Sequence, residues 1–220
     1  MRMVRDAEIR RLRDLELLVQ NIPSYTHPKL VLEQYVTDAN IVAVAVWDAY
    51  IRGYLMGAKV LDLGCGTGRF SIAAALMGAR HVACVDVDLS AVNVAKKYVD
   101  KHGLNNVDFI VMDARQDALR GEYNVVFQNP PFGIWTERGI DVKFLKTAMR
   151  HSNVIYTIHK LTTLKFISEK LKGWGCTMSI LDTITITIPP MYLHHRKRKY
   201  RVKVFLARAE CGNKGGINVK

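Results

Sequence analysis

Apolar residues follow two alternating patterns along the chain. Short, nearly continuous apolar runs are typical of parallel strands that are covered on both faces. These runs occupy residues 58–64, 81–88, 107–113, 123–128 and 152–158. Helical spacing separates them in "FSIAAALMGA", in "LSAVNVAKKYVDKHG" with its glycine stop at Gly103, and in "DVKFLKTAMRHS". Strands that alternate with helices in this way predict a doubly wound α/β sheet.

The C-terminal part breaks this alternation. Residues 176–188 and 200–210 are two strand-like runs with no helical segment between them. Consecutive strands without a crossover pair antiparallel. We therefore expect a sheet that is mostly parallel and ends in an antiparallel hairpin.

The N-terminal part has helical patterns. Ile9, Leu12 and Leu15 recur at helical spacing among charges of both signs, which indicates an amphipathic helix and not a signal peptide. The apolar run at 41–47 is too short to cross a bilayer and reads as a buried helix segment. We expect a cytoplasmic protein with no membrane span.

Charge and cysteine content narrow the class of protein. A formal charge of +12 and an isoelectric point near 9.6 favour a polyanionic partner such as nucleic acid. The cysteines at 65, 84, 176 and 211 form no C-x-x-C pair and no short metal-ligand cluster. We expect reduced thiols and no bound metal.

The first predicted strand ends in a glycine loop, "DLGCGTGRF", from Asp62 to Phe70. Glycines at such a position let a ligand approach the backbone, and an acid at the end of the next strand can accept from ribose hydroxyls. Asp86 has that place, twenty residues after Gly66. The third glycine of the dinucleotide-binding pattern is absent at its usual spacing. A glycine turn without a ligand, in an ordinary α/β protein, is the alternative interpretation of this loop.

The pattern D-x-G-x-G-x-G with acids after the second and third strands resembles the S-adenosylmethionine site of Rossmann-like methyltransferases. That resemblance implies that the carboxylate of Asp62 lies near the amino acid part of the cofactor and that Asp86 binds its ribose. It implies cofactor contacts for Gly64, Cys65 and Gly66 of the loop, and for Asp113 and Ala114 beside the adenine.

The fourth predicted strand runs into Asn129-Pro130-Pro131-Phe132. The two prolines explain why a strand ends here, but they do not explain the amide before them or the aromatic ring after them. The tetrapeptide resembles the [DNS]-P-P-[FYW] motif of amino-directed methyltransferases. We expect the Asn129 side chain and the Pro130 carbonyl to accept the N–H groups of a target amine beside the cofactor. Pro131 stiffens the backbone, and Phe132 stacks on a flipped base.

The resemblance extends over residues 10–209 to the archaeal and eukaryotic family that methylates N6 of an adenine in small-subunit ribosomal RNA. It is carried by "LEQYVTDANIVAVAVW", "NPPFG", "DVKFLKTAM", "IYTIHK" and "IPPMYLHHRKRKYRVKVFL". It implies ribosomal RNA or a preribosomal particle as substrate, and Gln34, Tyr35 and Thr37 as residues that close the cofactor site. It also implies a small zinc-binding activator subunit on an edge of the sheet.

These patterns divide the chain into three parts. Residues 1–50 form N-terminal helices with the cofactor-closing segment, 51–210 the Rossmann-like methyltransferase core, and 211–220 a tail. Within the core, the run "HHRKRKYRVK" is either a solvated hairpin turn or an RNA-binding cluster. We favour RNA binding by Arg196, Lys197, Arg198, Lys199 and Arg201.

Three other functions stay open at this point. Enzymes that methylate N5 of a glutamine side chain in a translation factor have the same kind of N-P-P site. DNA adenine is a further acceptor. A silent cofactor-binding scaffold in ribosome assembly would need neither Asn129 nor Phe132.

Overall fold

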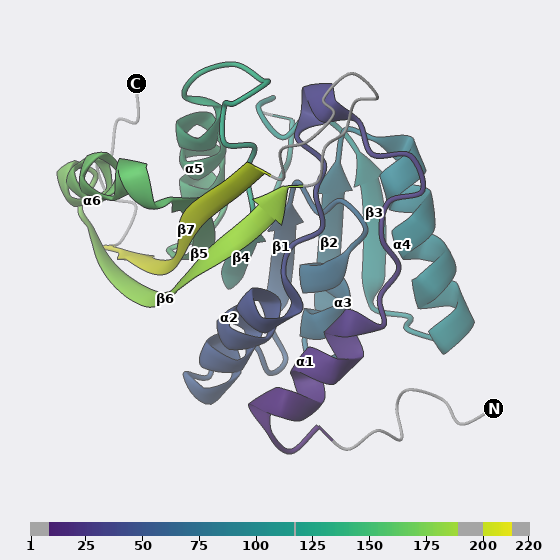
Figure 1. The fold of residues 1–220 in the computed structure, drawn as a ribbon. Helices are drawn as coiled ribbons and strands as arrows, with labels where there is room; N and C mark the ends of the chain where they lie inside the picture. The colour runs from purple at the N-terminus through teal and green to yellow at the C-terminus, as the bar shows by residue number, and fades with distance from the viewer. Residues whose placement is uncertain (1–8, 117, 189–199, 213–220) are drawn as a thin grey trace.

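The computed structural model describes residues 9–116, 118–188 and 200–212 and contains a seven-stranded sheet (Figure 1). The strand order is β3-β2-β1-β4-β5-β7-β6. The first five strands pair parallel, and β7 pairs antiparallel with both β5 and β6. The strands are β1 Lys59–Leu63, β2 His81–Asp86, β3 Val107–Val111, β4 Val125–Gln128, β5 Val154–Lys160, β6 Cys176–Ile188 and β7 Tyr200–Cys211. The predicted doubly wound sheet with its C-terminal antiparallel hairpin is confirmed.

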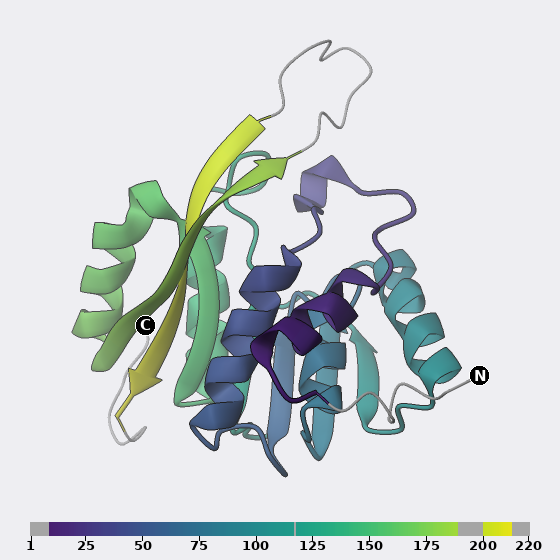
Figure 2. The ribbon, with the colours of Figure 1, turned by 60° about the horizontal axis from the view of Figure 1, so that its bottom comes forward.

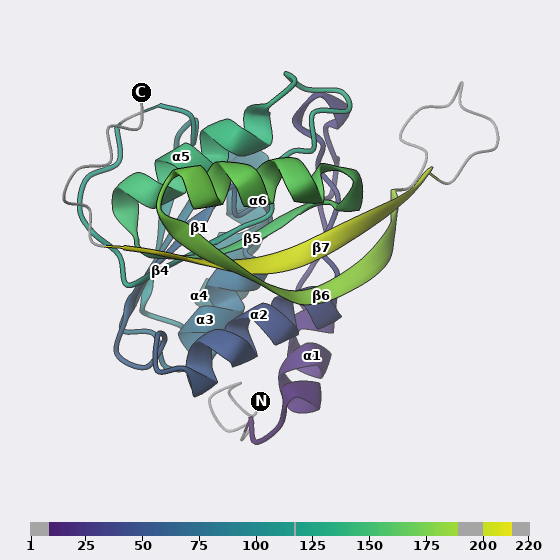
Figure 3. The ribbon, with the colours of Figure 1, turned by 90° about the vertical axis from the view of Figure 1, so that its left-hand side faces the viewer.

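Helices cover both faces of this sheet. The helices are α1 Leu12–Gln20, α2 Ala39–Ile51, α3 Arg69–Leu76, α4 Leu89–His102, α5 Ile140–His151 and α6 Leu164–Gly173. Figure 3 shows α1, α2 and α3 on one face and α5 and α6 on the other. The strand side chains alternate between the two resulting cores: Phe127 belongs to the first and Val126 to the second. All four residues of β4 are buried, as expected for a strand covered on both sides.

The helix ends follow from local chemistry. The side chain of Asp38 accepts a hydrogen bond from the backbone of Asn40 at the start of α2, and Asp88 does the same for Ser90 at the start of α4. Gly103 adopts the left-handed conformation after α4, which confirms the predicted stop. Most of α2 is buried, as predicted for its apolar segment. No helix in the described part of the chain is long and apolar enough to cross a membrane.

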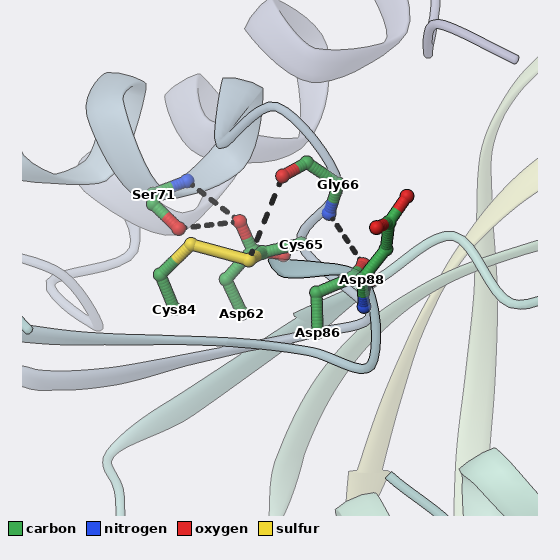
Figure 4. The surroundings of a disulfide bond; sticks show 7 residues. All are labelled: Asp62, Cys65, Gly66, Ser71, Cys84, Asp86 and Asp88. Carbon is green, nitrogen blue, oxygen red and sulfur yellow. Dashed lines mark hydrogen bonds between the residues drawn. A yellow bond between two sulfur atoms is a disulfide. The ribbon is translucent and has the colours of Figure 1, made fainter. Parts of the chain in front are cut away.

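The expectation of reduced thiols is wrong for this structure, which pairs all four cysteines. Cys65 of the glycine loop bonds to Cys84 of β2 (Figure 4), and Cys176 bonds to Cys211. Strand register explains both pairs: Cys84 lies beside Asp62 across β1 and β2, and Cys176 is directly opposite Cys211 in the hairpin. These contacts depend on how the strands pair, so the spacing of the cysteines along the sequence could not predict them.

Candidate active site

A cavity of about 260 Å³ lies beyond the last residues of β1, β2, β3 and β4. This is the carboxyl edge of the parallel strands, where open α/β sheets bind their ligands. The chain between α1 and α2, residues 21–38, passes over this edge and contains the short helix η2, Leu30–Leu32 (Figure 1). We call these residues the covering segment. Tyr25, Leu32 and Glu33 of that covering segment form part of the wall.

Nine of the predicted cofactor residues line the cavity together. They are Gln34, Tyr35, Thr37, Gly64, Cys65, Asp86, Asp113, Ala114 and Asn129. They come from the covering segment and from the residues at or after the ends of four strands. Asp62 and Gly66 lie behind this wall: Asp62 is 1% exposed, and the backbone N–H of Gly66 donates to Asp86 at 2.8 Å.

Asp62 supports the glycine loop from within. Its Oδ2 accepts from the backbone N–H of Ser71 at 2.8 Å and from the Ser71 hydroxyl at 2.6 Å, in the first turn of α3 (Figure 4). Burial raises the pKa of Asp62 to about 7, although the Ser71 hydrogen bonds lower it. Asp62 is therefore not part of the cavity wall, and its predicted contact with the amino acid part of a cofactor stays a prediction.

The raised pKa of Asp62 leads to a prediction about pH. The folded protein holds a proton up to about pH 7 that the unfolded chain releases near 3.8, so the free energy of unfolding falls as pH rises through this window. Asp62→Asn should remove the part of this fall that Asp62 causes, which is on the order of 3 kcal/mol. Urea unfolding from pH 4 to 7.5 measures it, with Asp100→Asn on the exposed side of α4 as control. The same slope in Asp62→Asn and the unmodified protein would contradict the raised pKa.

Asp86 stands at the end of β2 and organises two loops. Its Oδ2 accepts from Gly66 and its Oδ1 from the backbone N–H of Asp88, both at 2.8 Å (Figure 4). Burial raises the pKa of Asp86, although these bonds lower it. Each carboxylate oxygen keeps a further lone pair for a ligand hydroxyl. Asp86 is thus suited to accept hydrogen bonds from a bound molecule.

Gln34 reaches the site through Asp88. Its Nε2 donates to Asp88 Oδ2 at 2.7 Å, and the Lys29 ammonium lies 2.7 Å from Oδ1 of the same carboxylate. Burial alone would raise the pKa of Asp88, but the hydrogen bonds from Gln34, Lys29 and Ser90 lower it to about 2. This ionised carboxylate attaches the covering segment to the start of α4.

Asp113 forms an ion pair within the cavity wall. The Nε of Arg115 donates to Asp113 Oδ1 at 2.9 Å, and this hydrogen bond holds the pKa of the carboxyl below its usual value. Ala114 between them is buried. Arg115 belongs to the wall but was not among the predicted residues.

The residues after β4 separate into two groups. Asn129 and Pro131 line the cavity, whereas the Phe132 ring is 4% exposed and lies 5.4 Å, centroid to centroid, from the ring of Tyr35. Pro130 is buried as well. Asn129 Nδ2 donates to Thr37 Oγ1 at 3.0 Å. The structure therefore joins Asn129 to the covering segment and places Phe132 behind the wall.

Three buried polar atoms of cavity residues have no hydrogen-bond partner among the described residues. They are the side-chain oxygen Oδ1 of Asn129, the hydroxyl of Tyr35 and Nε of Arg69. Buried polar groups in native proteins are almost always matched, so unmatched ones at a cavity indicate a polar ligand. Asn129 offers an acceptor, and burial raises the pKa of Tyr35, which keeps its hydroxyl as a donor.

Sequence reasoning missed Tyr25 and Glu33. A Cβ atom on Gly66 would collide with the Tyr25 hydroxyl, so this side chain lies directly against the glycine loop. Glu33 accepts four backbone hydrogen bonds from residues 132–136. Glu33 is the second residue of the segment "LEQYVTDANIVAVAVW" and could have been found there, whereas Tyr25 stands between polar residues and prolines with no pattern around it.

The predicted RNA-binding cluster is only partly described. Arg196, Lys197, Arg198 and Lys199 lie outside the described residues. Arg201 and Lys203 are exposed on β7, and Arg201 pairs with Thr187 of β6. Figure 2 shows that the hairpin end where β6 stops lies on the same side of the molecule as η2. A position of the cluster beside Asn129 stays a prediction.

Comparison with known proteins identifies the chain. The family model for the methyltransferase small domain matches residues 51–153, from the end of α2 to the end of α5. The rRNA N(6)-adenosine-methyltransferase Mettl5 of Drosophila melanogaster is 33% identical over 211 residues, which cover 92% of this chain and 97% of that protein. The chain belongs to this methyltransferase family. The resemblance found in the motifs is thereby confirmed, and the protein is an enzyme.

Further similarity agrees with this family. The rRNA N(6)-adenosine-methyltransferase METTL5 of Danio rerio is 29% identical to this chain over 198 residues, which cover 88% of this chain and 96% of the Danio rerio protein. The crystal structure of a candidate RNA methyltransferase from Pyrococcus horikoshii superposes with a TM-score of 0.82 at 31% identity. That match covers 94% of this chain and all of the other. The α/β, Rossmann-like methyltransferase fold thus extends over nearly the whole chain.

Proposed function

We propose that the enzyme transfers a methyl group from S-adenosylmethionine to N6 of an adenine in RNA, most specifically in small-subunit ribosomal RNA. The observation that carries the proposal is the buried Oδ1 of Asn129 at the carboxyl edge of the sheet, which has no hydrogen-bond partner in the described part of the chain. An acceptor held in this way binds an N–H of the target amine. Family membership supplies the nucleic acid: the relatives in Drosophila melanogaster and Danio rerio are named for ribosomal RNA.

The cavity residues fit S-adenosylmethionine. Asp86 retains acceptor positions for the ribose hydroxyls, and Ala114 presents an apolar surface to the adenine beside Asp113. We assign the remaining contacts to Gln34, Tyr35 and Thr37 of the covering segment and to Gly64 and Cys65 of the glycine loop. The bound cofactor supplies an electrophilic methyl group. The side chains of the enzyme have to orient the amino group that accepts it.

Asn129 and Pro130 orient the acceptor. The lone pair of an adenine amino group is delocalised into the ring, so the nitrogen is a poor nucleophile unless it is held correctly. The Asn129 oxygen accepts one N–H, and the donation from Asn129 Nδ2 to Thr37 keeps the oxygen free for this contact. Acceptance of the second N–H by the carbonyl of the buried Pro130 stays a prediction. The proton is acidic once the methyl group has been transferred, so no strong base is required.

Stacking of the base on Phe132 stays a prediction. The ring is 4% exposed and packs on Tyr35, so an entering base has to displace part of this contact. Aromatic rings commonly form the stacking surface for flipped nucleotides.

Incubation with labelled S-adenosylmethionine tests the proposal. The acceptors are ribosomal RNA, free nucleotides, DNA and a protein extract, each in a separate reaction. We expect label in ribosomal RNA. Label in protein alone would contradict the proposal and favour a glutamine acceptor.

We also propose a small zinc-binding activator subunit, on the basis of the family resemblance. The described sheet ends on one side in β3, where Val111 is 50% exposed, and the backbone of an edge strand can pair with a strand of a partner. The labelling reaction is therefore run with and without the candidate subunit. A cytoplasmic location stays a prediction.

The basic cluster at 196–201 leads to a prediction about salt. If four of its cations neutralise phosphates of a single strand, the slope of log affinity for RNA against log salt is roughly −3. Replacement of Arg196, Lys197, Arg198 and Lys199 by Ser should flatten this slope and weaken RNA binding, with cofactor affinity unchanged. RNA binding from low to high salt measures the effect. Identical slopes in the two proteins would assign the cluster to a solvated turn.

A further inference from the structure

The loop that follows β4 encloses one carboxylate from the covering segment. Glu33 Oε1 accepts from the backbone N–H groups of Ile134 at 2.6 Å, Trp135 at 2.9 Å and Thr136 at 3.0 Å. It also accepts from the Thr136 hydroxyl at 2.8 Å. Glu33 Oε2 accepts from the backbone N–H of Phe132 at 2.6 Å. Five donors thus converge on a side chain that lies about a hundred positions away in the sequence.

This geometry requires an anion. Successive backbone N–H groups that point to one place form a concave site for negative charge. Glu33 is 5% exposed, so the donors around it have little access to water. Without the carboxylate, the buried N–H of Phe132 and the partly buried N–H groups of residues 134–136 would lose their shared acceptor and would lie close to one another, which disfavours this loop conformation.

Glu33 itself adopts an unusual conformation. Its φ of 50° is the one positive value at a non-glycine residue in the described part of the chain. Its backbone N–H donates to the Leu30 carbonyl at 2.8 Å, which closes η2. Strained backbone at a non-glycine residue is concentrated at functional sites, because surrounding contacts have to hold it there.

The same short segment contacts Asn129 and the cofactor residues. Thr37 accepts from Asn129 Nδ2 at 3.0 Å, and the Tyr35 ring packs on Phe132. Gln34 donates to Asp88, whose backbone N–H binds Asp86. Residues 33–37 therefore touch both ends of Asn129-Pro130-Pro131-Phe132 and the wall where we place the cofactor.

We propose that Glu33 is a positioning residue for methyl transfer. It holds residues 132–136 by charge and so sets the direction of the Asn129 side chain, without contact to the substrate. This inference rests on the proposed function for its effect on turnover, but its structural part can be measured on the protein alone.

Glu33→Gln tests the role of the charge. The amide keeps the size of the side chain but places an N–H group against the backbone donors. We expect kcat for RNA methylation to fall by about 100-fold, as for a displacement of about 1 Å at a catalytic group. KM for RNA should change by less than about threefold, because the phosphate contacts proposed for the basic cluster remain.

Hydrogen exchange locates the change. In Glu33→Gln, the amides of residues 132 and 134–136 should exchange at least about tenfold faster, while those of β1 and β5 keep their rates. Glu169→Gln on the exposed side of α6 is the matched control and should change neither exchange nor kcat. Unchanged exchange at 132–136, or turnover within threefold of the unmodified protein, would overturn the proposal.

Two further variants cover a failure of Glu33→Gln to fold. Glu33→Asp keeps the charge but is one methylene shorter, and it should retain more kcat than Glu33→Gly. In Glu33→Gly, added acetate at constant ionic strength should restore part of kcat and of the protection at 132–136. No effect of acetate on either quantity, together with equal kcat in the two variants, would overturn the role of the carboxylate.

The exchange data separate this inference from the proposed function. If the unmodified protein methylates no RNA but Glu33→Gln loses protection at 132–136, the RNA substrate is wrong and the role of Glu33 in the loop stands. If RNA is methylated and Glu33→Gln behaves like the unmodified protein, Glu33 is not the positioning residue.

Discussion

We expect Asn129→Ala to lower the rate of methyl transfer to RNA by about a hundredfold or more, which corresponds to about 3 kcal/mol. The substitution removes the buried Oδ1 that has no partner among the described residues, and with it the acceptor for the target amine. It also removes the donor to Thr37. Cofactor binding should stay close to that of the unmodified protein, because the contacts assigned to Asp86 and to the covering segment remain.

Single-turnover methylation and calorimetry measure these two effects separately. Asn105→Ala is the matched control, since Asn105 is exposed in the turn between α4 and β3, at the opposite edge of the sheet. It should change neither rate nor affinity. Near-normal turnover by Asn129→Ala would rule out its role as the acceptor.

Gly66→Val should disrupt both the fold of the glycine loop and cofactor binding. Gly66 has a φ of 54°, a conformation that β-branched residues rarely adopt, and a Cβ atom there would collide with the Tyr25 hydroxyl. Left-handed strain and overpacking together should lower the free energy of unfolding by about 2–5 kcal/mol. Displacement of Tyr25 changes the cavity wall, so cofactor affinity should fall by about a hundredfold or more.

Gly121→Val separates strain from collision. Gly121 has a φ of 97°, and a Cβ atom there would meet nothing within 4 Å. This variant should lose about 1–2 kcal/mol of stability with unchanged cofactor affinity. Urea unfolding and calorimetry on both variants give the comparison. Equal cofactor affinity in Gly66→Val and the unmodified protein would show that Tyr25 and the loop do not shape the site.

Much of the fold follows from the sequence because burial on two faces leaves a clear pattern. Each predicted strand coincides with an observed one, and the ends of β1 and β4 bring the glycine loop and Asn129 to one edge of the sheet. Helix α6 was not predicted. Its apolar residues Leu164, Ile167 and Leu171 do recur at helical spacing, and Ile167 and Leu171 are buried, so the pattern was present in the sequence and was overlooked.

The details of the site depend on contacts that no local pattern encodes. Asp62 faces α3 because strand side chains alternate, and Val60 on the same face belongs to the first core. Glu33 meets residues 132–136 only because the covering segment crosses the sheet edge. The disulfides likewise depend on strand register.

Nucleoside analysis of methylated RNA tests the proposed reaction most directly. Ribosomal RNA is treated with the unmodified enzyme or with Asn129→Ala in the presence of S-adenosylmethionine, digested to nucleosides and separated by mass-resolved chromatography. We predict N6-methyladenosine after treatment with the unmodified enzyme and at least about a hundredfold less after treatment with Asn129→Ala for the same time. A different methylated nucleoside, or equal N6-methyladenosine from both proteins, would contradict transfer to an adenine amine held by Asn129.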